Sequence, residues 1–283
     1  MKIPFKKMHG TGNDFIVINY NDFPYPKDFS RLAIEACHRN FGIGGDGMMI
    51  VASPEDKNAS VKMIYFNRDG SLASMCGNGI RCFAKYVYDE KIVKKEIFKI
   101  QTKAGLLTVN TKTADGKVSF VKVYMGKMLL KPEAIPVAYN GDNYINKKIV
   151  VEGREFQISS VLMGVPHTII FTEELNDEAV KHFGPIIEGL EIFPEKTNVN
   201  FAKIHNRAAI SVKTWERGAG YTLACGTGVT SVCGVAYLLG MVDNWIEVTI
   251  DGGKLFISIS NDGNMEMEGP AETICEGIYY LKN

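Results

Sequence analysis

Apolar residues along this chain recur in the two spacings that are typical of helices and of strands. Helical spacing predicts helices over residues 28–39, 80–88 and 229–239, and one more within residues 174–188. Short apolar runs between turn residues predict strands at residues 15–19, 48–52, 61–67, 96–102, 106–110, 118–123, 147–151, 155–161, 168–171, 200–204, 208–215, 245–250, 254–258, 264–267 and 272–281. The chain is therefore expected to combine a few helices with a larger number of strands.

The order of these predicted elements is the same in two parts of the chain. One series starts at the tetrad Cys76-Gly77-Asn78-Gly79 and the other at Cys225-Gly226-Thr227-Gly228. Each tetrad reads as a glycine-rich turn, followed by a helix and then by three strands. A repeat of this length predicts two similarly folded halves that each carry one copy of a site-bearing unit.

The length and the repeat together predict two domains, because 283 residues are long for one hydrophobic core. We expect an N-terminal domain over residues 1–127 and a C-terminal domain over residues 128–271, with the active site in the cleft between them. Residues 125–141 have little periodicity and are read as the link. The last predicted strand has no counterpart in the first repeat, so residues 272–283 are expected to return to the first domain.

The charge balance and the apolar runs limit the classes of partner. Thirty-two basic and 32 acidic residues give a net charge of zero, so no basic patch indicates nucleic acid. No apolar run approaches the length of a membrane span, and residues 1–7 lack the apolar segment of a signal peptide. We therefore expect a cytoplasmic protein that binds neither nucleic acid nor membrane.

One well-known nucleotide-binding motif matches the sequence, but the predicted elements around it have the wrong order for nucleotide binding. Residues 42–47 match G-x-G-x-x-G. The dinucleotide fingerprint requires a strand before the glycines and a helix after them, whereas here the predicted helix comes first. A tight turn, or a loop beside a site, is the better interpretation.

The chain has six cysteines, and the repeat separates two of them from the rest. None forms a C-x-x-C pair, and a cytoplasmic chain of this size has no need of disulfides. Cys37, Cys82, Cys233 and Cys275 are expected to be small buried apolar residues. Cys76 and Cys225, at matching helix starts, are expected to be functional.

The tetrads suit a reaction that needs two thiols. A helix N-terminus lowers the pKa of a thiol, and the glycines let backbone N–H groups approach an anion. A substrate carboxylate is expected on the N–H groups of Gly77, Asn78, Gly226 and Thr227. One thiolate would then remove the proton beside that carboxylate while the opposing thiol delivers a proton to the other face. This chemistry inverts a stereocentre, and nothing in the sequence marks a pyridoxal phosphate or metal site.

Polar residues near the tetrads are suited to a substrate with a second amino-acid end. Glu216 and Arg217 close a predicted strand just before Cys225, and Asn67 has the matching place before Cys76. An arginine binds a carboxylate with two hydrogen bonds, and a glutamate can hold an ammonium group. Asn198 is a further candidate contact.

These motifs resemble the diaminopimelate epimerase family, which epimerises an amino acid without a cofactor. The resemblance is carried by residues 9–15, 66–71, 75–82, 216–220 and 224–228, in family order through nearly the whole chain. It implies an α/β fold of two pseudo-symmetric domains, each with a mixed, mainly antiparallel sheet around a central helix. It also implies conversion of LL- to meso-diaminopimelate, a precursor of lysine and peptidoglycan, by a homodimer.

The resemblance also implies a role for individual residues. Cys76 and Cys225 would be the acid and base, and His167 and Glu216 would tune them. The substrate would contact five residues, namely Asn13, Asn67, Asn198, Glu216 and Arg217.

Three positions depart from the family pattern and keep two alternatives open. Val165 stands where the family usually has asparagine, Tyr221 where glutamate is common, and Arg68 where a smaller residue is common. A changed distal contact would fit a racemase of another amino acid on the same fold. The paired cysteines alone would also allow a thiol-based binding or sensing protein without the reaction.

Overall fold

The computed structural model describes residues 2–22, 28–73 and 75–281 of the chain. The chain divides into two compact units. Unit 1 is Met1–Tyr124 with Glu268–Asn283, and unit 2 is Met125–Met267. The domain borders expected from the sequence, after residues 127 and 271, lie within a few residues of these divisions. Unit 1 is discontinuous in sequence, whereas unit 2 is one continuous segment.

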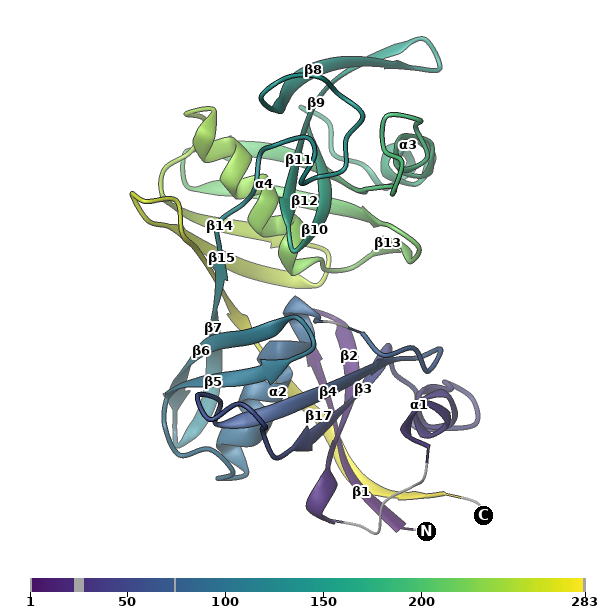
Figure 1. Ribbon diagram of the computed structural model, residues 1–283, viewed down its shortest axis with the longest axis vertical. Coiled ribbons are helices and arrows are strands. Elements are labelled where there is room, and N and C mark those ends of the chain that lie inside the picture. Colours follow the sequence, from purple (N-terminus) through teal and green to yellow (C-terminus); the bar gives the residue numbers. More distant parts are fainter. Residues whose placement is uncertain (1, 23–27, 74, 282–283) are drawn as a thin grey trace. The chain divides into compact units, whose positions relative to one another are not determined.

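Unit 1 is a mixed sheet with two α-helices (Figure 1). Its elements are β1 (Lys2–Gly10), β2 (Asn13–Asn19), the 3-10 turn η1 (Tyr20–Asp22), α1 (Phe29–Cys37), β3 (Gly47–Ala52), β4 (Val61–Asn67), α2 (Gly77–Asp89), β5 (Ile97–Thr102), β6 (Gly105–Ala114), β7 (Lys117–Gly126) and β17 (Glu272–Tyr280). The strands pair in the order β17-β1-β2-β3-β4-β5-β6-β7. The pairs β2/β3 and β4/β5 are parallel, and the other pairs are antiparallel.

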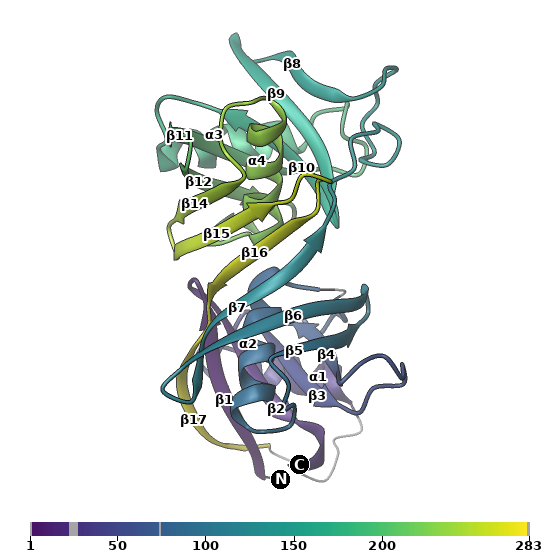
Figure 2. The ribbon, with the colours of Figure 1, turned by 90° about the vertical axis from the view of Figure 1, so that its left-hand side faces the viewer.

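Unit 2 repeats this plan (Figure 2). Its elements are β8 (Tyr144–Val151), β9 (Arg154–Met163), β10 (Val165–Phe171), α3 (Asp177–Glu188), β11 (Asn198–Asn206), β12 (Ala209–Glu216), β13 (Gly220–Thr222), α4 (Gly226–Leu238), β14 (Trp245–Ile250), β15 (Gly253–Ile259) and β16 (Met265–Pro270), whose last residues lie in unit 1. The pairs β10/β11 and β12/β14 are parallel, and β8/β9, β9/β10, β11/β12, β12/β13 and β14/β15 are antiparallel.

The two units correspond element by element. In each, a parallel pair is followed by an antiparallel neighbour, a helix, a second parallel pair and an antiparallel hairpin. The series β2-β3-β4-α2-β5-β6 of unit 1 therefore matches β10-β11-β12-α4-β14-β15 of unit 2. The internal repeat and the mixed, mainly antiparallel fold expected from the sequence are both confirmed.

One helix in each unit is buried over almost its whole length. In α2 every residue from Gly77 to Val87 is buried, and in α4 every residue from Gly228 to Ala236 is buried. The helix α2 packs against β1, β2, β3 and β6, and α4 against β9, β10, β11, β12 and β15. Since the sides of these helices are covered, their first turns decide what chemistry they present.

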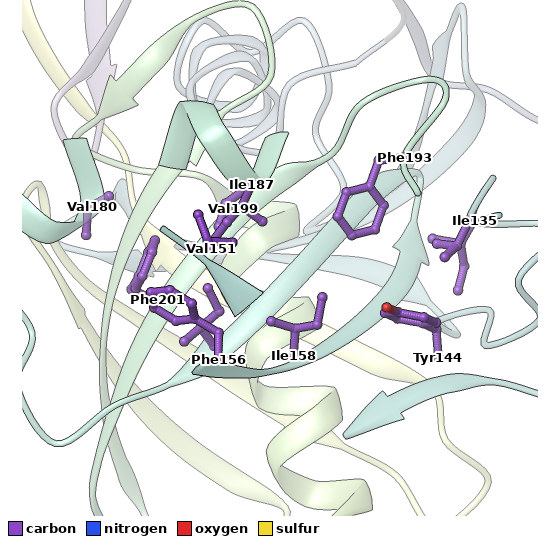
Figure 3. Close-up of a cluster of buried hydrophobic side chains, with 12 residues drawn as sticks. Ile135, Tyr144, Val151, Phe156, Ile158, Val180, Ile187, Phe193, Val199 and Phe201 are labelled. Atoms are coloured by element: carbon purple, nitrogen blue, oxygen red, sulfur yellow. The ribbon is translucent and has the colours of Figure 1, made fainter. Parts of the chain in front are cut away.

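The helices α1 and α3 cover the sheets from outside and are capped by side chains. Asp28 Oδ1 accepts from the Arg31 N–H at 3.0 Å, and Asn176 Oδ1 accepts from the Ala179 N–H at 2.8 Å. In unit 2 the side chains of α3 meet those of β9 and β11 in one apolar cluster (Figure 3). Phe156 and Ile158 from β9 lie at its centre, and Val180 and Ile187 come from α3.

Three expectations are corrected by the structure. The strand β1 was not predicted, because Pro4 and the Lys6-Lys7 pair interrupt its apolar pattern. The helices α2 and α4 begin at Gly77 and Gly226, three residues earlier than the apolar spacing indicates, so the tetrad glycines form the first helical turn. Cys275 is exposed rather than buried, because β17 presents most of its residues to solvent.

Removal of a central apolar side chain tests this account of the unit 2 core. Ile158→Ala is expected to lower the free energy of unfolding by about 2–5 kcal/mol, because Ile158 is 0% exposed among the residues of Figure 3. Val150→Ala, on the neighbouring strand with Val150 68% exposed, is the control and should change it by less than about 0.5 kcal/mol. Urea denaturation measures both. Equal effects would contradict the core described here.

Candidate active site

Each tetrad cysteine is the residue immediately before a buried helix. The backbone of Cys76 is extended, with φ −138° and ψ 123°, and its carbonyl accepts from the Ile80 N–H at 2.9 Å. Cys225 has φ −125° and ψ 104°, and its carbonyl accepts from the Val229 N–H at 2.9 Å. Both sulfurs therefore lie at a helix N-terminus, where the partial positive charge favours a thiolate and attracts anions.

The second glycine of each tetrad lies close to its surroundings. A Cβ on Gly228 would meet Asn200 Oδ1 at 2.3 Å and Cys225 Sγ at 3.3 Å. A Cβ on Gly79 would meet Met49 Sδ and Cys76 Cβ at 3.3 and 3.4 Å. Position 228 therefore has no room for a Cβ atom, whereas position 79 can accept one with a small adjustment of its neighbours.

In unit 1, Cys76 belongs to a hydrogen-bond network with two asparagines. The Cys76 thiol donates to Asn13 Oδ1 at 3.5 Å, and Asn78 Nδ2 donates to the same oxygen at 3.5 Å. Asn13 Nδ2 donates in turn to Asp46 Oδ2 at 2.5 Å. The structure thereby brings together the three predicted site residues Cys76, Asn13 and Asn78.

A buried arginine lies under this network. Arg81 is 0% exposed, and its guanidinium donates to Gly77 O and Thr11 Oγ1 at 3.1 Å each and to Pro270 O at 3.2 Å. Burial lowers the pKa of Arg81 to about 10, while negative charge on Cys82 and Cys76 would act in the opposite direction. Arg81 therefore remains a cation at neutral pH.

The turn between β1 and β2 holds a threonine in the left-handed region. Thr11 has φ +51°, which is costly for a β-branched residue. Its hydroxyl accepts from Arg81 and donates to Asn78 Oδ1 at 3.4 Å. In this left-handed conformation, the Thr11 hydroxyl forms hydrogen bonds with both the Arg81 guanidinium and the side chain of Asn78.

In unit 2, Cys225 is connected to a buried histidine through the tetrad threonine. Cys225 Sγ lies 3.6 Å from Thr227 Oγ1, and Thr227 Oγ1 lies 3.0 Å from His167 Nε2. His167 Nδ1 lies 3.2 Å from Asn200 Nδ2. Burial, with the nearby charge of Arg217, lowers the pKa of His167 to about 3, so its ring is neutral at pH 7.

The side chains of the remaining candidates of unit 2 form hydrogen bonds with their surroundings. Asn198 Nδ2 donates to Pro166 O at 2.8 Å, and Asn198 Oδ1 accepts from the Arg217 N–H at 2.9 Å. Arg217 Nη1 donates to Glu195 O at 2.6 Å. Glu216 Oε1 accepts from Thr222 Oγ1 at 2.6 Å. These contacts order the end of β12 beside Asn198.

Asn67 closes β4 in unit 1, as Glu216 closes β12 in unit 2. Its Nδ2 donates to Ser71 Oγ at 3.0 Å, and its N–H donates to Ser71 O at 2.9 Å. These bonds are those of a turn residue. Its predicted role toward a substrate stays a prediction.

Two positions that depart from the family pattern have different surroundings. The Tyr221 hydroxyl donates to Asp177 Oδ1 at 2.9 Å, contacts Asp251 Oδ2 and accepts from Lys213 Nζ at 3.0 Å. It thus belongs to an ion-pair cluster on unit 2. Val165 begins β10 and is 36% exposed.

The other cysteines match the expected inert character, apart from Cys275. Burial raises the pKa of Cys37 and of Cys82 to about 12, and burial raises the pKa of Cys233 further. These thiols stay protonated at neutral pH. Within the described ranges, no cluster of His, Cys, Asp and Glu could hold a metal ion, and no helix is long and apolar enough to cross a membrane.

The sequence did not single out Asn200, Asp46, Thr11 or Arg81. Asn200 lies two residues after Asn198 on β11, so both point to the same face of the strand, and this spacing was an available signal. Arg81 was detectable as a charge on the apolar side of a predicted helix. Asp46 and Thr11 act through partners that are distant in sequence, and no local pattern reveals them.

Comparisons with known proteins agree with these features. A family model described as diaminopimelate epimerase matches residues 5–131 and 159–274. A protein named diaminopimelate epimerase from Alkaliphilus metalliredigens is 58% identical over 279 residues, covering 99% of this chain and 98% of that protein. One of the same name from Clostridium perfringens is 47% identical over 275 residues, covering 97% and 98%.

Solved structures share the fold at low sequence identity. A hydroxyproline epimerase from Agrobacterium vitis gives a TM-score of 0.74 at 13% identity, covering 98% of this chain and 90% of that one. A PhzF-family phenazine biosynthesis protein from Bacillus anthracis gives 0.69 at 14%, covering 99% and 100%. At these sequence identities, the comparisons show a shared fold and nothing more.

The close approach at Gly228 gives a matched pair of substitutions. Gly228→Ala is expected to destabilise the protein by about 1–3 kcal/mol, because its Cβ would lie 2.3 Å from the oxygen of buried Asn200. Gly79→Ala, at 3.3 Å from the flexible Met49 side chain, should be near neutral. Thermal unfolding of both variants measures this. A larger loss for Gly79→Ala would contradict the geometry.

Proposed function

Since this chain belongs to the diaminopimelate epimerase family, we propose that it interconverts LL- and meso-diaminopimelate by proton transfer between two cysteines. The observation that carries the proposal is the repeat itself. Each unit places one thiol at the N-terminus of its buried helix. A single base could only return a proton to the face from which it came, whereas a thiolate and a thiol can invert the α-carbon.

In the proposed reaction one sulfur, as thiolate, takes the α-proton, and the electron pair moves toward the substrate carboxylate. The other sulfur gives its proton to the opposite face of the carbon. The carboxylate gains charge in this step. The helix N-termini at Gly77, Asn78, Gly226 and Thr227 would stabilise that charge with fixed N–H dipoles.

The substrate's second amino-acid end requires further contacts. For this role we propose Arg217 with its planar guanidinium, Glu216 with its carboxylate, and Asn67 and Asn198 at strand ends. Asn13 would act beside Cys76, its hydrogen-bond partner. His167 and Glu216 are proposed to tune the thiols, and His167 would do so as a neutral ring.

A racemase for another amino acid is the second candidate; it was suggested by Val165 and Tyr221, and of these two only Val165 still favours it. The Tyr221 hydroxyl forms hydrogen bonds with Asp177, Asp251 and Lys213. These contacts explain a tyrosine at position 221 without a change of substrate. The two relatives in sequence, at 58% and 47% identity, carry the name diaminopimelate epimerase. Within the described residues none of the six cysteines forms a disulfide, which supports a reducing, cytoplasmic setting.

A homodimer through β17 is part of the proposal. Its exposed face alternates acidic and apolar side chains, namely Glu272, Ile274, Glu276, Ile278 and Tyr280. The adjacent strand β1 contributes Lys2 and Lys6 beside Tyr280 and Glu276. A surface with both charges around apolar residues can be complementary to a second copy of itself.

Placing a charge on this face tests the dimer. Ile278→Lys is expected to convert a dimer to a monomer in sedimentation velocity, because an ammonium group would replace an apolar contact. Val150→Lys, on an exposed position of unit 2, is the control and should leave the dimer intact. A wild-type protein that sediments as a monomer would refute this part of the proposal.

Single cysteine variants test the two-thiol reaction. Cys76→Ala and Cys225→Ala are each expected to lower epimerisation by at least about 10²-fold, the smaller end of the range for lost acid–base catalysis. Cys275→Ala, which removes an exposed thiol outside the site, should retain full activity. Circular dichroism checks that the fold is kept. Full turnover in either tetrad variant would exclude the mechanism.

Proton NMR in D2O, under reducing conditions and without added cofactor, identifies the substrate. With LL-diaminopimelate, the α-proton signal should disappear as the meso isomer appears. Exchange in another amino acid, with none in diaminopimelate, would indicate the second candidate and make Val165 the residue to change. Ligand binding without exchange in any amino acid would favour a thiol-based binding protein.

A further inference from the structure

A series of four hydrogen bonds in unit 1 joins a buried arginine to an aspartate through the side chains of two predicted site residues. Arg81 Nη2 lies 3.1 Å from Thr11 Oγ1, and Thr11 Oγ1 lies 3.4 Å from Asn78 Oδ1. Asn78 Nδ2 lies 3.5 Å from Asn13 Oδ1, and Asn13 Nδ2 lies 2.5 Å from Asp46 Oδ2. The series starts at a guanidinium, which can only donate, and ends at a carboxylate, which can only accept.

The direction of these bonds can be followed from the arginine end. Since Arg81 donates to the Thr11 oxygen, the Thr11 hydroxyl proton is left for the Asn78 side chain and needs an acceptor there. Asn78 must therefore turn its Oδ1 toward Thr11 and its Nδ2 toward Asn13. Thr11 and Asn78 are each 2% exposed and Arg81 is 0% exposed, so water has little access to replace a wrongly oriented partner.

The aspartate end gives the same direction independently. Asp46 Oδ2 accepts from Asn13 Nδ2 and also from the Asp14 N–H at 3.2 Å. Because the NH2 group of Asn13 must face this carboxylate, its Oδ1 faces the tetrad, at 3.5 Å from both Cys76 Sγ and Asn78 Nδ2. This arrangement needs the same orientation of the Asn78 amide that the arginine end requires.

Asp46 is itself held in place by an ion pair and by the backbone of its loop. Its Oδ1 accepts from Arg39 Nη2 at 2.8 Å, and Arg39 also donates to both carboxylate oxygens of Asp14, at 2.9 and 3.2 Å. The Asp46 N–H donates to Asp14 O at 2.8 Å. The loop is residues 42–47, whose glycines match the nucleotide-binding motif. In this fold the loop places a carboxylate beside the start of β2.

The backbone of Thr11 is strained, and its hydroxyl gives that strain a role. A φ of +51° is costly for a β-branched residue, whereas a glycine adopts it readily. Residues held in such conformations cluster at functional sites. Here the side chain that a glycine would lack is the link from the Arg81 guanidinium to the Asn78 amide.

We propose that Asp46 and Arg81 are positioning residues that fix the orientation of the two site amides. Asp46 acts on Asn13 directly. Arg81 acts on Asn78 through the Thr11 hydroxyl. Both amides are thereby set before a substrate binds, and the site presents an acceptor oxygen at the tetrad rather than an NH2 group. This inference rests on the proposed function, in which both asparagines lie beside the substrate, and adds the residues that prepare them.

The orientation of the Asn13 amide can be measured without substrate by ¹H–¹⁵N NMR, with the signals assigned by their loss in Asn13→Ala. In the wild-type protein the two Nδ2 protons should be farther apart in chemical shift than those of an exposed amide, because one of them is bound to a carboxylate. Asp46→Leu should reduce this separation. Asp22→Leu is the matched control, since Asp22 accepts from Asn19 Nδ2 at 3.3 Å at the other end of β2. An equal separation in the wild type and Asp46→Leu would overturn the proposal.

Two substitutions of Asp46 separate the direction of its hydrogen bond from its charge. In Asp46→Asn the side-chain oxygen can still face Asn13 Nδ2 and the Asp14 N–H, so kcat/KM should fall by less than about threefold. In Asp46→Leu no acceptor remains, and kcat/KM should fall by at least roughly tenfold. Both are measured well below the unfolding temperature of each variant. Equal losses would show that the charge of Asp46 matters rather than its role as an acceptor, and would overturn the proposal.

The arginine end has its own test, which needs no variant of Asp46. Thr11→Val removes the hydroxyl and keeps the shape, so it should shift the side-chain amide signals of Asn78 and lower kcat/KM by about three- to tenfold. Thr11→Ser keeps the hydroxyl and should do neither. Thr111→Val is the control for loss of a buried hydroxyl, because Thr111 is 1% exposed and donates to Glu96 O at 3.2 Å. It should lower the unfolding temperature and leave kcat/KM unchanged. Equal losses in Thr11→Val and Thr11→Ser would exclude the link to Arg81.

These measurements distinguish failure of the positioning roles from failure of the proposed function. A wild-type protein whose Asn13 signals show the bond to Asp46, but which exchanges no α-proton in any amino acid, would refute the proposed function and not the orientation of the amides. Full proton exchange, together with an Asn13 amide that Asp46→Leu leaves unchanged, would refute the positioning roles and keep the proposed function.

Discussion

A helix that is covered on every side can offer its backbone to a ligand only at its ends. That constraint governs both units, because α2 is buried from Gly77 to Val87 and α4 from Gly228 to Ala236. Their N–H groups at the N-terminus have no earlier carbonyl in the helix to bind. The residue before each helix thus lies beside a concentrated positive potential within a mostly apolar interior. In this chain that residue is a cysteine in both units.

The need for small residues at these ends follows from the same burial. Gly228 lies where a methyl group would enter the space of Asn200 Oδ1, and this amide is one that orients His167. Packing and hydrogen bonding are therefore coupled, since the amide whose oxygen requires glycine at position 228 also contacts the ring of His167. In unit 1 the corresponding glycine is less confined, and a different residue type, the asparagine at position 78, occupies the middle of the tetrad.

Much of this architecture can be predicted from the sequence, because it depends on the local pattern of apolar and turn residues. The apolar spacing and turn residues located α2, α4 and most strands, and the repeated tetrads located both cysteines. Elements that depend on distant partners were missed. The strand β1 owes its place to pairing with β2 and β17, and Asp46 matters through Asn13, far from it in sequence. Exposure of Cys275 likewise follows from the tertiary position of β17.

The return of β17 to β1 has a consequence for the way this chain is made. In the sequence, unit 2 is one continuous segment between the two segments of unit 1, so a ribosome synthesises all of it before the last strand of unit 1. During that interval the edge of β1 that later pairs with β17 is unsatisfied, and open edges of this kind attract other strands. The order of synthesis therefore makes unit 2 the part that can finish folding first. The edge of β1 that pairs with β17 stays open until residues 272–280 have been synthesised.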